Sequence, residues 1–145
     1  MTDWYDILAE PLAAAEHGIA AADAFFGSIH DGPLNFNAID YPAAQTYLEN
    51  FEQSGGQGTE FQIAVSTTLY FEWSRETDTR EDVLHPLAAV IQATLAAFAT
   101  VDCITDYHPA RIDFFAGEPQ SSLVLAVSIQ FRVTTLVDPG EFGDG

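Results

Sequence analysis

A long run of alternating residues, 59–73, constrains the fold of this chain more than any other stretch. One side of the run is apolar except for a single threonine: Phe61, Ile63, Val65, Thr67, Leu69, Phe71 and Trp73. A period of two is that of a β-strand, whose successive side chains point to opposite faces of a sheet. The run therefore predicts a long strand with one buried face.

Three further stretches predict strands of the same sheet. Residues 121–136 repeat the one-sided alternation, with Leu123, Leu125, Val127, Ile129, Phe131 and Val133 on one face. Residues 104–115 are extended in pattern, and the Gly- and Pro-containing segment 116–120 predicts a turn, so 104–136 is interpreted as a hairpin. Residues 44–51 suit a strand about as well as a helix, and the alternation of Tyr47, Glu49 and Phe51 favours a strand covered in part on both faces.

Two stretches predict helices that cover the apolar face of the sheet. Residues 2–26 have helical spacing, and Pro11 and Gly18 are expected to kink or divide that helix. In the second stretch, Asp78 or Thr79 is the expected N-cap, and the apolar stripe is Val83, Leu87, Val90, Ile91, Thr94, Leu95 and Phe98. Pro86 either kinks this second helix or marks the start of its regular part.

Together these elements predict one α+β (mixed α/β) domain over residues 1–137. Its sheet is antiparallel or mixed, has four to five strands and is covered by two helices. Residues 27–42 contain turn signals around a short extended piece at 34–37. Residues 138–145, rich in Gly, Asp and Glu, are expected to form a flexible C-terminal tail.

The charge of the chain is its most unusual property. Twenty-two Asp and Glu residues face four arginines and no lysine, which gives a formal net charge of -18 and a pI near 4.1. At about 1 M salt the Debye length falls to roughly 3 Å, so repulsion among such charges is screened. The composition is therefore typical of a protein from a halophilic source. A disordered acidic protein or a DNA mimic is the alternative, but 12% aromatic residues argue against disorder.

The acidic composition and the sequence pattern also argue against nucleic-acid binding, a membrane span and secretion. Four cations cannot neutralise many phosphates, so direct nucleic-acid binding is not expected. No segment is apolar enough for a bilayer span, and the acidic N-terminus is unlike a signal peptide. One cysteine, Cys103, rules out an intramolecular disulfide.

The sequence carries no recognised catalytic signature, and we expect no enzyme activity, cofactor or metal. Asp102, Cys103, Asp106 and His108 form the best candidate metal or catalytic cluster, but a zinc site usually needs paired Cys or His residues at fixed spacing. The competing hypothesis is a small halophilic enzyme or ligand-binding domain with a pocket near Asp106 and His108.

The order of the expected elements resembles that of the tail terminator proteins of long-tailed, lambda-like viruses. The resemblance is closest at residues 38–49, Ala-Ile-Asp-Tyr-Pro-Ala-Ala-Gln-Thr-Tyr-Leu-Glu, which are similar to that family's Asp-aromatic-Pro segment leading into a strand. It continues through the polar loop 50–59, the long strand 61–73, the acidic helix start 76–82 and the closing strand that ends near Leu136. It covers residues 25–136; the chain differs from the family in its longer N-terminal helical region and its acidity.

This resemblance implies a structural virion protein at the head-proximal end of the tail, assembled in the host cytoplasm. It would form a homo-oligomeric ring, a hexamer, on the tail-tube protein, end tube polymerisation and offer a surface to the head–tail connector. DNA would pass through the lumen without specific binding. A neck or head-completion protein of the same virion is the nearer alternative, and the acidity suggests a virus of a halophilic archaeal host.

Ring closure repeats one heterologous interface around an axis, which needs contact residues on two different surfaces of each subunit. The expected contact residues are the four arginines, Arg75, Arg80, Arg111 and Arg132, and the glycine-rich loop of Gly55, Gly56 and Gly58. Each arginine can pair with carboxylates of a neighbouring copy. The simpler interpretation is that they form ordinary surface ion pairs, which contribute little in high salt.

Overall fold

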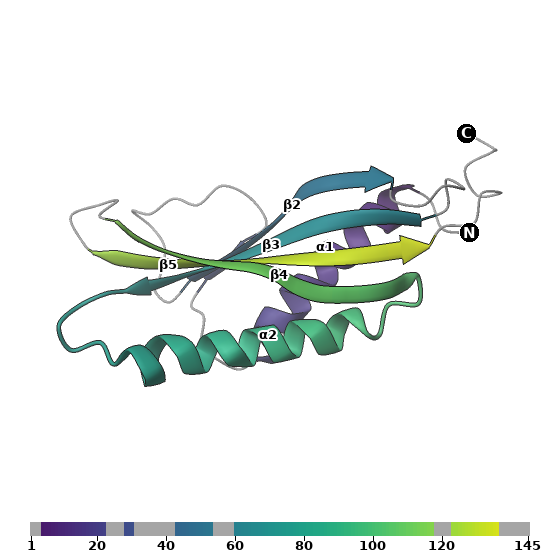
Figure 1. Cartoon of the computed structure of the whole chain (residues 1–145). Coiled ribbons are helices and arrows are strands. Elements are labelled where there is room, and N and C mark those ends of the chain that lie inside the picture. Colours follow the sequence, from purple (N-terminus) through teal and green to yellow (C-terminus); the bar gives the residue numbers. More distant parts are fainter. Residues whose placement is uncertain (1–3, 23–27, 31–42, 54–59, 118–122, 137–145) are drawn as a thin grey trace.

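The chain folds into a single α+β domain with two helices on one face of a twisted sheet (Figure 1), as the sequence predicts. The computed structural model describes residues 4–22, 28–30, 43–53, 60–117 and 123–136. Within these ranges the helices are α1 (Trp4–Ala21) and α2 (His85–Phe98), and a π-helical turn, η1 (Thr79–Leu84), precedes α2. The strands are β1 (Ser28–His30), β2 (Ala43–Gln53), β3 (Glu60–Glu72), β4 (Ile104–Gly117) and β5 (Val124–Leu136).

The strand order is β1-β2-β3-β5-β4, so the two long alternating strands lie together at the centre. β3 and β5 pair antiparallel without interruption from Glu60↔Leu136 to Glu72↔Val124. β2 and β4 flank them, also antiparallel, and β1 pairs parallel with the first residues of β2. The sequence did not predict β1, because three residues show no period. The extended piece expected at 34–37 and the tail at 138–145 lie outside the described residues.

The core lies between the helices and the face of the sheet that the sequence predicts to be apolar. Ile63, Val65 and Leu69 of β3 are fully buried there, as are four residues of β5: Val127, Ile129, Phe131 and Val133. From the helices, Ile19 of α1 and the α2 stripe close over them. Burial of this apolar surface, at about 25 cal/mol per Å², is the main term that holds helices and sheet together.

Helix α1 is continuous through both Pro11 and Gly18, so the expected division of the helix is wrong. Pro11 removes only one helix hydrogen bond. It lies on the buried side of α1, where packing holds the segment in helical form. Gly18 has a packing role instead. A Cβ added to it would lie 2.5 Å from the Cα of Thr94, so only glycine allows α1 to approach α2 this closely.

The start of the second helical stretch resolves the two alternatives left by the sequence. Asp78 is the N-cap: its carboxylate accepts hydrogen bonds from the backbone N–H groups of Arg80 and Glu81, at 3.0 and 3.4 Å. Asp82 in turn accepts from the backbone N–H of Asp78 at 2.8 Å, a reciprocal capping arrangement. The regular α-helix begins at His85, so Pro86 marks its start, where the missing N–H costs nothing.

Candidate functional site

Strand β4 is the most exposed long element of the described structure. It forms one edge of the sheet, 14 residues long, and only Ile104 of its residues is buried. Three large apolar side chains near its end are exposed: Ile112 at 39%, Phe114 at 52% and Phe115 at 56%. Natural proteins usually shorten or charge such an edge because its free N–H and C=O groups can pair with another chain. β4 is not shortened, and its charged residues and Pro109 all lie before residue 114, so the end with Phe114 and Phe115 has no such protection.

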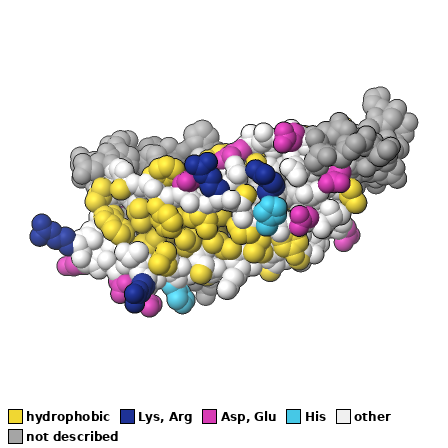
Figure 2. All heavy atoms as spheres, viewed as in Figure 1, with side chains coloured by type: hydrophobic (Ala, Val, Ile, Leu, Met, Phe, Trp, Pro, Cys, Tyr) yellow, Lys and Arg dark blue, Asp and Glu magenta, His cyan; other side chains and the backbone are white. Residues whose placement is uncertain are grey.

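The two halves of β4 differ in how well they can accept another strand. Register shifts fall between Ile104 and Asp106 and between Pro109 and Arg111, and Pro109 has no N–H to donate. From Arg111 onward β4 pairs with β5 without a shift, and this half carries the exposed apolar side chains. Figure 2 shows apolar surface gathered over β4 and α2, with arginine side chains on either side of it.

A second open edge lies on the other side of the sheet, along β2. β1 pairs only with the first three residues of β2, so residues 46–53 have no strand partner on their outer side in the described part of the chain. Exposed aromatic side chains lie here too, with Tyr47 at 38% and Trp4 at 45%. The Trp4 ring packs edge-on against Phe51 of β2, with centroids 5.5 Å apart.

A β-bulge changes which side chains of β2 point to which face. Leu48 pairs with Val65 and Asn50 with Ala64, so Glu49 is the extra residue. The alternation that the sequence suggests, with Tyr47, Glu49 and Phe51 on one side, is therefore wrong. Phe51 is shifted to the helix-covered face, where it stacks on Phe61, while Glu49 stays on the open face.

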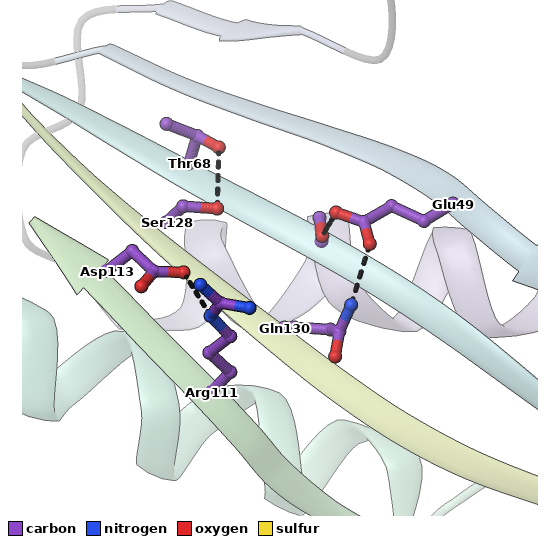
Figure 3. A network of polar contacts seen from close by, with 7 residues as sticks. Glu49, Thr68, Arg111, Asp113, Ser128 and Gln130 are labelled. Atoms are coloured by element: carbon purple, nitrogen blue, oxygen red, sulfur yellow. Dashed lines mark hydrogen bonds and ion pairs between the residues drawn. The ribbon is translucent and has the colours of Figure 1, made fainter. Parts of the chain in front are cut away.

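The open face of the sheet, opposite the helices, is polar and hydrogen bonded (Figure 3). The Glu49 carboxylate accepts hydrogen bonds from the fully buried hydroxyl of Ser66 on β3 and from the Gln130 amide on β5, the latter at 2.7 Å. On the neighbouring strand β4, Arg111 forms an ion pair with Asp113 at 2.7 Å. A hollow of about 210 Å³ lies beside Glu49 and Arg132.

The four arginines lie in two separate regions, and all are exposed. Arg111 and Arg132 belong to adjacent strands, and Arg132 pairs in register with His108 of β4. Arg75 follows β3 in a turn, and Arg80 lies in η1. Of the four arginines, only Arg111 forms an ion pair with a described carboxylate, so the ordinary surface ion pairs are not seen for the other three within the described residues. Gly55, Gly56 and Gly58 lie outside the described residues.

The structure separates the residues of the candidate metal cluster. His108 and Asp106 lie on β4 with Nδ1 and Oδ2 3.9 Å apart, whereas the Cys103 thiol donates a hydrogen bond to Glu10 of α1 at 3.4 Å. Burial and the Glu10 carboxylate raise the pKa of Cys103 to about 11. Across the described ranges, no group of three or more His, Cys, Asp or Glu side chains is placed to hold a metal ion. Cys103 and Glu10 line a hollow of about 500 Å³, away from Asp106 and His108.

A long strand edge is one of the contact surfaces that ring closure led us to expect, but the sequence did not identify which strands form the two open edges. The existence of the strands was predictable. Which strand lies outermost depends on the pairing order, and β4 lies outside β5 rather than beside β3.

In the helices that the structure describes, no segment has the length and apolarity needed to cross a bilayer. No protein-family model matches the chain, and no curated protein matches it as a relative.

Proposed function

We propose that this chain is a structural virion protein, a tail terminator that assembles as a hexameric ring on the head-proximal end of a viral tail tube. In this role it ends tube polymerisation and joins the tail to the head connector. The observation that carries the proposal is the exposed β4 edge, with Ile112, Phe114 and Phe115 accessible along a strand of 14 residues.

An edge strand of this kind supports assembly because it combines two sources of affinity. Its unpaired backbone groups can form main-chain hydrogen bonds with an added strand, and its apolar side chains supply hydrophobic contact area. Exposed apolar surface is a liability in a protein that works alone. A chain that functions in a ring buries such a surface against its neighbours.

The charge of the chain supports a ring through which DNA passes. The chain has a formal net charge of -18 and only four cations. A ring lumen formed by such chains repels phosphate and does not bind the DNA through counterion release. The same surface is suited to molar salt, where the repulsion among subunits is screened over roughly 3 Å. We therefore place the protein in a virus of a halophilic host, with assembly in the host cytoplasm.

The proposed function is tested by tube polymerisation in molar KCl with purified tail-tube protein of the same virus. Addition of this chain before polymerisation is expected to shorten the tubes in proportion to its concentration, and electron microscopy is expected to show a ring at one end of each tube. Addition of the matched variant Phe114→Glu/Phe115→Glu is expected to give tubes as long as those formed without any added chain. Tubes of unaltered length with the unmodified chain would contradict the terminator role, and binding only to head connectors would identify a neck protein instead.

A further inference from the structure

We infer that the regular half of β4, residues 111–117, pairs edge to edge with residues 46–53 of β2 in a second copy of this chain. The inference rests on the proposed ring and names the two surfaces that meet within it. The occupant of the β4 edge is thus the same protein, and the sheet continues from one copy into the next.

The position of the two open edges is the first argument. β4 and β2 lie on opposite sides of the central pair β3–β5, so they belong to different surfaces of one domain. A contact between two different surfaces is heterologous and can repeat around an axis into a ring. Pairing of β4 with another β4 would be isologous and would stop at a dimer.

Charge is the second argument. The open stretch of β2 carries the exposed carboxylates Glu49 and Glu52 and no basic residue. The open face at β4 carries Arg111, and Arg132 follows on the adjacent strand. Asp106 and Asp113 of β4 balance these two arginines, so the β4 edge is close to neutral, and its contact with the acidic β2 edge meets no net repulsion. Pairing of β2 with β2 would bring four glutamates together, which is unfavourable.

Apolar side chains on both edges are the third argument. Ile112 and Phe114 of β4 and Trp4 beside β2 are exposed on the helix side of the sheet, whereas Phe115 of β4 and Tyr47 of β2 are exposed on the open face. Cross-strand pairs of aromatic and β-branched side chains on one face contribute roughly 0.2–1 kcal/mol each in a sheet. Both edges therefore offer backbone groups and apolar side chains on each face of a continued sheet.

Cysteine cross-linking tests this pairing. Cys103→Ser removes the native thiol and keeps a hydroxyl that can donate to Glu10. Asn50→Cys on β2 and Gly117→Cys on β4 are then introduced together; both positions are exposed on the open face, neither residue is charged, and a Cβ at Gly117 meets no neighbouring atom within 4 Å. The protein is treated with a flexible bis-maleimide in molar KCl, with and without tail-tube protein, and the covalent products are separated in detergent.

The double variant is expected to give a ladder of covalent oligomers up to the mass of the ring, whereas each single variant is expected to stay monomeric in detergent. The matched control combines Asn50→Cys with Ala96→Cys on the exposed surface of α2, and it is expected to give no ladder. Cross-linked dimers from Gly117→Cys alone would show that β4 pairs with β4 and would overturn the inference.

Light scattering on the same samples separates failure of the inference from failure of the proposed function. Rings seen by light scattering without a covalent ladder would overturn the β4–β2 pairing and leave the ring intact. Monomers under both conditions, with and without tail-tube protein, would overturn both.

Discussion

The Glu49 carboxylate on β2 accepts a 2.7 Å hydrogen bond from the Gln130 amide on β5, although the residues are 81 positions apart and β3 lies between their strands (Figure 3). Glu49 lies on the open face, as Tyr47 does, and the bulge at Glu49 shifts only the residues that follow it. Beneath it, the buried Ser66 hydroxyl donates to the same carboxylate. One glutamate therefore connects three adjacent strands on the side of the sheet that no described helix covers.

Replacement of Glu49 by alanine is expected to lower the free energy of unfolding by about 1–3 kcal/mol, because the buried Ser66 hydroxyl loses its acceptor. The measurement is urea denaturation in about 3 M KCl, where charge effects are screened. Glu52→Ala is the matched control, since it removes an exposed carboxylate from the same strand. Equal stability of the two variants would show that the hydrogen bonds of Glu49 contribute nothing.

Gly18→Ala is expected to destabilise the protein, although alanine is the better helix former by roughly 1 kcal/mol. The new Cβ would meet the backbone of Thr94 at 2.5 Å, and α1 would have to move away from α2. We expect a net loss of about 1–3 kcal/mol by thermal unfolding, as for other overpacked cores. The control Ala20→Gly, on the exposed side of α1, reports the helix propensity alone. A raised melting temperature for Gly18→Ala would contradict the close packing of the helices.

The raised pKa of Cys103 predicts slow alkylation. Since only the thiolate reacts, a pKa of about 11 leaves Cys103 protonated at pH 8, and its reaction with iodoacetamide should be roughly ten- to a hundredfold slower than that of free cysteine. The rate should still rise above pH 9, because the folded thiol titrates higher than the unfolded one. Glu10→Gln should speed the reaction, and distant Glu52→Gln should not. A rate equal to that of free cysteine would contradict the contact with Glu10.

Salt is expected to raise the melting temperature, with most of the rise below about 1 M KCl. In that range the Debye length falls to roughly 3 Å, and the repulsion among the 22 carboxylates is lost. Three of the four arginines have no ion pair with a described residue, so salt has few attractive pairs to weaken. Calorimetry from dilute buffer to 3 M KCl measures the effect. A melting temperature that stays constant or falls would contradict a surface adapted to molar salt.

The central strands and both helices were predictable because each has one buried face. β3 alternates over its whole length, and Val83, Leu87 and Val90 recur at helical spacing, so periodicity alone locates them. Asp78 as N-cap was one of two candidates, and only the hydrogen bonds to Arg80 and Glu81 distinguish it from Thr79. These features are local, and local sequence specifies them.

The candidate contact surfaces were less predictable because they depend on non-local pairing. The bulge at Glu49 moves the side chain of Phe51 to the helix-covered face of the sheet. Nothing in the sequence of residues 44–51 marks the position of the extra residue. The separation of the four arginines into two regions follows from the strand order, which the sequence does not show. The exposure of Phe114 and Phe115 was likewise not predictable, because it depends on the edge position of β4.

The most direct test of the account is the absolute mass of the chain, measured by light scattering after size exclusion in about 3 M KCl, with and without tail-tube protein. The unmodified chain is expected to have the mass of a hexamer, alone or once the tube protein is added, and Phe114→Glu/Phe115→Glu is expected to remain a folded monomer in both cases. A compact monomer that does not respond to the tube protein would contradict the ring. So would a hexamer that forms equally well with both phenylalanines replaced, because assembly would then not use the β4 edge.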